Sequence, residues 1–116
     1  MDKFELIERT KRFAVKVYFF AENLPNSRGA NNIAYQIHKS SSSVAANYRA
    51  ACRAKSKSDF INKLKIVEEE ADETLFWLEF TKALSLVKND NELNPLLKEA
   101  DELVAIFTKS LKTLRG

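Results

Sequence analysis

The chain has 116 residues, of which 45% are apolar and 30% are charged, a balance that can fill one buried core and still cover it with solvated side chains. Only two glycines and two prolines occur, which excludes a fold rich in tight turns and favours long helices. The single cysteine, Cys52, excludes an internal disulfide, and its small neighbours favour a buried structural thiol over a redox group.

No membrane or export segment is predicted. The apolar run at residues 13–21 is short and is interrupted by Lys16, so it cannot span a bilayer. Acidic side chains at Asp2, Glu5 and Glu8 do not fit a signal peptide. A cytoplasmic protein is therefore expected.

The net charge is only +3, but it is distributed unevenly along the chain. Residues 1–57 hold 11 bases and 4 acids, whereas residues 58–116 hold 8 bases and 12 acids. Between Glu22 and Asp59 there are six bases and no acid. This asymmetry predicts either an anionic partner or the neutralisation of one half of the fold by the other.

Four helices are predicted in chain order, at about residues 3–24, 30–55, 57–88 and 95–114. In the first helix, Asp2 is the expected N-cap with Glu5 three residues later, and Pro25 ends the helix. The apolar residues that recur near helical spacing are Leu6, Phe13, Val17, Phe20 and Leu24. The apolar face of the second helix consists of Ile33, Ile37, Val44, Tyr48 and Ala51.

The third helix starts at the Ser56 and Asp59 capping signature, and it is apolar on two sides. One stripe consists of Phe60, Leu64, Val67, Ala71, Leu75 and Leu78; the other includes Ile66, Trp77, Phe80, Leu84 and Val87. A helix with two apolar sides needs more partners than one bundle provides. Asn94 is the expected N-cap of the fourth helix, with Pro95 at its first position.

Four helices with short connections predict an all-α protein that folds as one domain over residues 1–116. The expected architecture is an up-down-up-down antiparallel four-helix bundle.

The candidate binding residues are the bases of the second helix and the turn after it. With Val44 at the centre of the buried face, Arg49 and Arg53 fall on the outer face, and Lys55 and Lys57 follow at the helix end. The supporting candidates are Arg28, Lys39, Lys63 and Lys65.

These bases have two interpretations. Arg49 and Arg53 could pair with the acidic run at residues 68–73, within the chain or across a subunit interface, while the lysines form a solvated face. Alternatively, the cluster contacts the phosphates of a nucleic acid.

The serine run at residues 40–43 also has two interpretations. Serine costs roughly 0.5 kcal/mol relative to alanine in a helix, so four in a row cost about 2 kcal/mol, and tertiary contacts have to offset this cost. Close approach of two helices is the preferred explanation, and hydroxyl contacts to phosphate are the alternative.

The sequence lacks the side chains that a reaction would need. A di-iron bundle requires two Glu-x-x-His pairs, and the only histidine is His38, so neither a metal nor another cofactor is predicted. There is no glycine-rich phosphate loop. His38 and Cys52 lie fourteen residues apart on one helix, about 21 Å at the helical rise, and cannot act together. No catalytic residue is assigned, and the protein is not expected to be an enzyme.

The segment from Ile33 to Glu79 resembles the four-helix bundle proteins related to bacterial 23S-rRNA intervening-sequence proteins. The residues that match the pattern of this family are Gln36, Ser43, Asn47, Phe60, Leu64 and Glu73. The sequence departs from the family at "NYRAA", residues 47–51, where N-I-A-E-G is common, and at Glu69 and Glu70, where a Gly-Ser pair is common.

The resemblance implies a ring-like homopentamer of four-helix protomers without established enzymatic activity. The accessory variability determinant proteins of diversity-generating retroelements are similar, and they bind nucleic acid and a reverse transcriptase through basic surface. The leading hypothesis is therefore a non-enzymatic, oligomeric accessory protein that binds nucleic acid, preferably RNA. The alternative is a structural or protein-interaction module whose basic and acidic faces pair within the oligomer or with a protein partner such as a reverse transcriptase.

Overall fold

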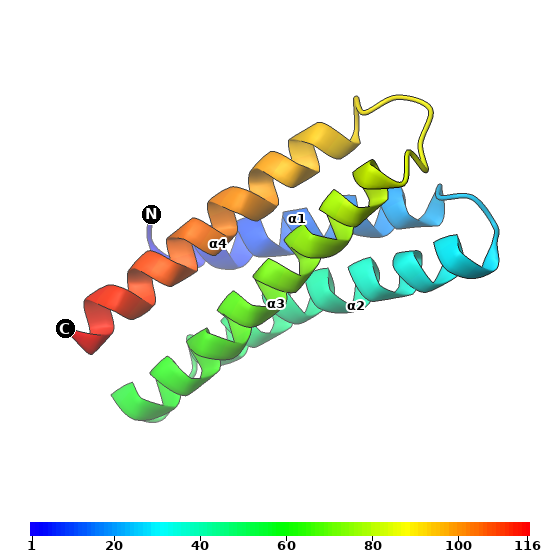
Figure 1. Cartoon of the computed structure of the whole chain (residues 1–116). Helices are drawn as coiled ribbons and strands as arrows, with labels where there is room; N and C mark the ends of the chain where they lie inside the picture. The colour runs from blue at the N-terminus through cyan, green and yellow to red at the C-terminus, as the bar shows by residue number, and fades with distance from the viewer.

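The computed structural model describes residues 1–116 as four α-helices joined by short turns (Figure 1). The helices are α1 (Lys3–Glu22), α2 (Arg28–Ala51), α3 (Lys57–Ala83) and α4 (Leu93–Arg115). Each helix runs antiparallel to the one before it, so both chain termini and the α2–α3 turn lie at the same end of a rod of 45 × 20 × 20 Å. The predicted all-α, up-down-up-down four-helix bundle is confirmed, while the pentamer remains a prediction.

The core runs along the whole rod because each helix contributes one apolar stripe. All five residues of the predicted α2 stripe are buried, as are Phe13 and Val17 on α1 and Phe107 on α4. On α3, the stripe through Leu64 and Leu78 is buried. Burial of these side chains at helical spacing is the main force that holds the helices together.

Side-chain caps fix where three of the helices begin. The Asp2 carboxylate accepts a hydrogen bond of 2.9 Å from the Glu5 N–H, and Ser56 Oγ accepts one of 3.1 Å from the Asp59 N–H. Both predicted N-caps are therefore confirmed. Ser27, which the sequence analysis did not identify as a cap, accepts from the Ala30 N–H at 3.2 Å. This cap starts α2 at residue 28, two residues before the predicted position.

The first two helices end earlier than predicted. α1 ends at Glu22 instead of about residue 24, because the residue before Pro25 is disfavoured in the helical conformation. α2 ends at Ala51 instead of about residue 55. The N–H groups of residues 53 and 54 bond three residues back, to Ala50 and Ala51, and the backbone then becomes extended at the Ser56 cap.

The third helix ends at Ala83, five residues before the predicted end. Ser85 takes a left-handed conformation with φ of 53°. Its N–H bonds the Lys82 carbonyl at 3.0 Å, and the Leu86 N–H bonds the Thr81 carbonyl at 3.4 Å, which is the Schellman pattern. Serine thus occupies a position that usually holds glycine, and this is why the sequence does not show the helix end.

The predicted N-cap of α4 is wrong. The helix begins at Leu93, with Glu92 at the N-cap position and no side-chain cap bond. Asn94 lies inside the first turn, where its amide oxygen accepts from Lys82 Nζ at 2.9 Å. Pro95 is the third helical residue, and it is tolerated because the first N–H groups of a helix have no helical acceptor.

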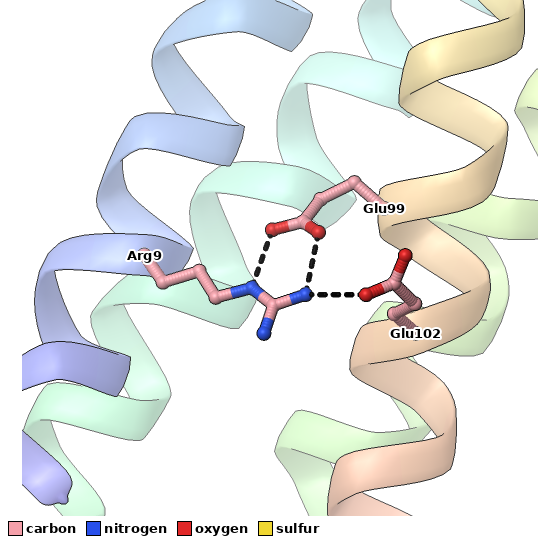
Figure 2. A network of polar contacts seen from close by, with 3 residues as sticks. All are labelled: Arg9, Glu99 and Glu102. Atoms are coloured by element: carbon pink, nitrogen blue, oxygen red, sulfur yellow. Dashed lines mark hydrogen bonds and ion pairs between the residues drawn. The ribbon is translucent and has the colours of Figure 1, made fainter. Parts of the chain in front are cut away.

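The α1–α4 contact is the smallest of the four contacts between neighbouring helices in the bundle, and α1 and α3 lie diagonally across it. Arg9 on α1 links the two helices through Glu99 and Glu102 on α4 (Figure 2). Its Nε and Nη2 each donate a hydrogen bond of 2.7 Å to the Glu99 carboxylate, and Nη2 also lies 3.0 Å from Glu102. The hydrogen bond to Glu99 is the main reason that the pKa of Arg9 lies above its ordinary value.

The serine run divides between the core and the surface. Ser40 and Ser41 are completely buried, whereas Ser42 is exposed and Ser43 is half-buried. Thr74 Oγ1 on α3 lies 2.8 Å from Ser40 Oγ, and this contact joins α2 and α3 across the core. Small side chains therefore permit close helix packing at residues 40 and 41, as expected from the sequence.

Candidate functional site

Lysine and arginine residues are concentrated in the segments at the end of the bundle that holds both termini. The antiparallel order brings residues 1–6, 46–63 and 109–116 together at this end. These segments hold nine bases and three acids, so their net side-chain charge is +6. We call the nine bases the basic pole: Lys3, Arg49, Arg53, Lys55, Lys57, Lys63, Lys109, Lys112 and Arg115.

Eight of the nine bases are exposed and have no carboxylate within ion-pairing distance. The exception is Lys63, whose Nζ lies 2.6 Å from Asp59 Oδ1. The bond from Lys63 lowers the pKa of Asp59 below its ordinary value, and the Lys55 N–H acts in the same direction. Asp59 is thus ionised at neutral pH and already neutralised, which leaves the other bases free for an external anion.

Four of the eight predicted binding residues lie together in the basic pole as free, exposed bases: Arg49, Arg53, Lys55 and Lys57. Lys63 lies in the pole but is paired. Lys65 is exposed on α3, about 12 Å further along the helix from Lys57.

Arg28 and Lys39 do not belong to this cluster. Arg28 is the first residue of α2, about 32 Å along the helix from Arg49, at the opposite end of the bundle. Lys39 lies near the middle of α2, where its Nζ is 6.0 Å from the centre of the Tyr35 ring. The helical wheel placed these bases on one face but did not take account of the length of the helix.

The sequence analysis missed four members of the pole: Lys3, Lys109, Lys112 and Arg115. Three of them lie in the last two turns of α4, and Lys3 opens α1. An up-down topology necessarily places the end of α4 beside the end of α2, so the predicted topology contained the signal. A comparison of the first and second halves of the chain does not show this grouping, because the bases at the end of α4 belong to the half with the net negative charge.

The ion pairs expected within the chain between the two α2 arginines and residues 68–73 do not form, because neither Arg49 nor Arg53 has a carboxylate partner. The middle of α3 and α4, residues 64–77 and 99–108, instead forms an acidic surface with one base and eight acids. Pairing across a subunit interface remains a prediction.

Part of the second apolar stripe of α3 is exposed to solvent. Phe76 and Phe80 are 51% and 38% exposed and stack with ring centres 5.8 Å apart. Ile66 and Leu84 are 46% and 48% exposed. Trp77 packs edge-on against both phenylalanines. An exposed aromatic cluster of this kind is typical of a surface that binds another macromolecule.

The residues that carry the family resemblance have structural positions. Gln36, Ser43 and Asn47 lie on the side of α2 that faces α3, and all three are half-buried. Asn47 Nδ2 donates to the Ser43 carbonyl at 2.9 Å and lies 2.8 Å from Ser43 Oγ. Of the other three, Leu64 is buried, Phe60 is half-buried and Glu73 is exposed.

The polar groups that could support a reaction lie apart. No group of three or more His, Cys, Asp or Glu side chains lies close enough to hold a metal ion. His38 is exposed and packs edge-on against Tyr18, at 5.3 Å between ring centres. Cys52 is half-buried beside Tyr48. Burial is the main cause that raises the pKa of Tyr48 above its ordinary value, and the neighbouring Cys52 acts in the same direction.

None of the four helices is both long enough and apolar enough to cross a membrane. The fold and its surface define the class: a four-helix bundle with a basic pole, an acidic middle on α3 and α4, and an exposed aromatic cluster.

The chain belongs to the 23S rRNA-intervening sequence protein family, whose model matches residues 2–109. No catalytic activity is known for this family. This chain is also similar to a solved structure from Bacteroides thetaiotaomicron, that of a protein of unknown function from the S23 ribosomal protein family. The two chains are 28% identical, with a TM-score of 0.85 over 97% of this chain and 99% of the other. No curated protein matches the chain.

Proposed function

We propose that this protein is a non-enzymatic accessory protein that binds RNA through the basic pole. The observation that carries the proposal is the set of eight exposed bases at one end of the rod without a carboxylate partner. Contact with phosphates requires several bases that can reach one backbone, and it requires no sequence-reading motif. The description of the family, which refers to a sequence within 23S rRNA, favours RNA over DNA.

The first test is fluorescence anisotropy of nuclease-treated protein with a labelled structured RNA over a series of salt concentrations. The logarithm of the affinity falls linearly with the logarithm of the salt concentration, and each phosphate that a base neutralises makes this slope more negative by about 0.7 to 0.9. If four or more bases of the pole take part, the slope is about −3 or steeper. Absence of binding at low salt would contradict the proposal.

A matched pair of double variants tests whether RNA binds at the basic pole. Lys112→Glu with Arg115→Glu reverses two charges in the pole, and Lys88→Glu with Lys98→Glu reverses two charges near the opposite end. Both double variants change the net charge by −4, so a general charge effect weakens binding equally in both. The proposal expects a large loss and a shallower salt slope for the pole variant only.

A second function, self-association, is favoured by the complementarity of two faces. Besides Arg9, which is paired with Glu99 and Glu102, residues 7–16 and 35–45 on α1 and α2 hold four bases and one acid, in contrast to the acidic surface of α3 and α4. Each side also exposes aromatic rings, Phe19 at 61% on α1 and Phe76 at 51% on α3. Because one face lies on α1 and α2 and the other on α3 and α4, a contact between them joins two different surfaces, so it is head-to-tail and can form a ring such as the predicted pentamer.

Analytical ultracentrifugation tests the assembly. Phe76→Ser with Phe80→Ser is expected to shift an oligomer to monomer, and an unchanged sedimentation coefficient would contradict the assigned face.

Arg49→Glu with Arg53→Glu distinguishes RNA binding from self-association as the role of these two arginines. Loss of RNA binding by an intact oligomer assigns these arginines to the pole, whereas dissociation of the oligomer assigns them to the interface.

A further inference from the structure

An apolar hollow opens at the end of the bundle that carries the basic pole. Its volume is about 390 Å³, which lies within the range of pockets that hold small ligands. All four helices contribute to its walls, through Leu6 on α1, Tyr48 on α2, Phe60 on α3 and Leu114 on α4, with Lys109 beside them. No carboxylate lines the hollow.

Two aromatic rings line this hollow, and they differ in exposure. Tyr48 is 6% exposed and packs against Phe107 with ring centres 5.6 Å apart, so its ring is fixed by the core. Phe60 lies in the first turn of α3 and is half-buried, so part of its ring is accessible from solvent. An accessible aromatic ring at the mouth of an apolar hollow is a surface on which a flat apolar ring can stack.

Positive charge surrounds the hollow. Lys109 lies on its wall. Lys57 precedes Phe60 by three residues, so the two side chains share one face of α3. Lys63 follows Phe60 by three residues, but its charge is already neutralised by Asp59. Lys109 on the wall of the hollow and Lys57 one helical turn from Phe60 both lack a carboxylate partner, so both can contact an anion at the hollow.

We propose that this hollow takes one unpaired nucleobase of an RNA strand, while Lys57 and Lys109 contact its neighbouring phosphates. This inference rests on the proposed function and adds the form of RNA that the pole prefers. The flat aromatic face of a base can stack on the rings of the hollow while the phosphates on either side meet the cations. A base in a duplex cannot enter because it remains stacked and paired. The pole therefore selects single strands, loops or bulges over duplex RNA.

The test compares a labelled single-stranded RNA with a duplex of the same length for three proteins: wild type, Phe60→Leu and Phe4→Leu. Stacking on an aromatic side chain contributes about 1–3 kcal/mol per base, so Phe60→Leu is expected to weaken single-strand binding about fivefold or more. Duplex binding, which uses phosphates alone, is expected to change less than twofold. Phe4→Leu is the control, because it removes an exposed ring at the same end of the bundle that does not line the hollow.

The outcomes separate the two proposals. Equal effects of Phe60→Leu on both RNAs, or no effect on either, overturn the hollow as a base site. Either result leaves the proposal that the basic pole binds phosphates unchanged. Failure of the wild type to bind either RNA overturns both proposals. If Phe60→Leu unfolds, Phe60→Trp in a Trp77→Phe background gives a second measurement. Its fluorescence is expected to be quenched by the single strand and not by the duplex, and equal quenching by both RNAs overturns the inference.

Discussion

Arg9 and Glu99 join the first and last helices through two parallel hydrogen bonds of 2.7 Å each. Together with the neighbouring contact to Glu102, they form the only ion pairs between helices in the structure. The Arg9 side chain is 18% exposed and that of Glu99 is 27% exposed, so solvent screens this pair only in part. The ion pair lies between α1 and α4, the two neighbouring helices with the smallest contact, and it is the charged contact that holds these two helices together.

A double-mutant cycle with Arg9→Met and Glu99→Gln is expected to give a coupling free energy of about 1–2 kcal/mol in urea unfolding, because the pair is bidentate and partly buried. The comparison pair is Lys63 and Asp59, whose side chains are 36% and 35% exposed. An exposed pair four residues apart on one helix is worth only about 0.3–0.5 kcal/mol. Equal coupling in both pairs would mean that burial adds nothing at the α1–α4 contact.

Ser40 tests the close packing of α2 against α3. Ser40→Leu places a large side chain where the serine is completely buried, and this overpacking is expected to lower the free energy of unfolding by about 1–3 kcal/mol. Ser42→Leu, on the exposed face of the same helix, is expected to change it by less than about 0.5 kcal/mol. Chemical denaturation measures both variants, and a similar loss in both would refute a packing role for Ser40.

Ser85→Gly is expected to stabilise the protein. The left-handed conformation costs an ordinary residue about 1–2 kcal/mol, and glycine avoids this cost while losing about 0.4–1 kcal/mol in chain entropy. The net expectation is a gain of about 0.5–1 kcal/mol in the free energy of unfolding. The same change inside a helix, Ser42→Gly, should destabilise by about 0.5 kcal/mol. Two changes of the same sign would show that Ser85 is not strained.

Tyr48 makes stability depend on pH in the alkaline range. An unfolded tyrosine loses its proton near pH 10, whereas burial holds the pKa of folded Tyr48 higher. The contribution of the neutral phenol is therefore complete below about pH 10 and is lost as pH rises above it. Tyr48→Phe should make the fall in stability between about pH 10 and 11.5 shallower. Urea unfolding at several alkaline pH values checks this, and identical slopes for both proteins would rule out the buried phenol as the cause.

The periodicity of the apolar residues predicted the bundle because each stripe is continuous and each helix is long. Helix boundaries followed from the sequence at Asp2 and Ser56, where a side chain makes a standard cap, although the standard cap at Ser27 was not recognised. They did not follow where the cap is unusual, as at Ser85, or where a helix starts without a side-chain cap, as at Glu92.

The candidate site could be predicted only in part, because it is assembled from three separate segments. The bases around Arg53 were visible as a run, but those of the last helix join them only through the antiparallel topology. The hollow could not be predicted at all, since it depends on how Leu6, Tyr48 and Leu114 come together in space.

The position of the two termini affects how binding should be measured. A purification tag on either end would lie beside the basic pole, and a polyhistidine or acidic tag there would alter the very charge that is being tested. The turn between α3 and α4, around residues 88–91, lies at the far end of the rod and offers a place for a label (Figure 1). Cleavage of terminal tags, or a fluorophore attached in this turn, would leave the pole as the sequence encodes it.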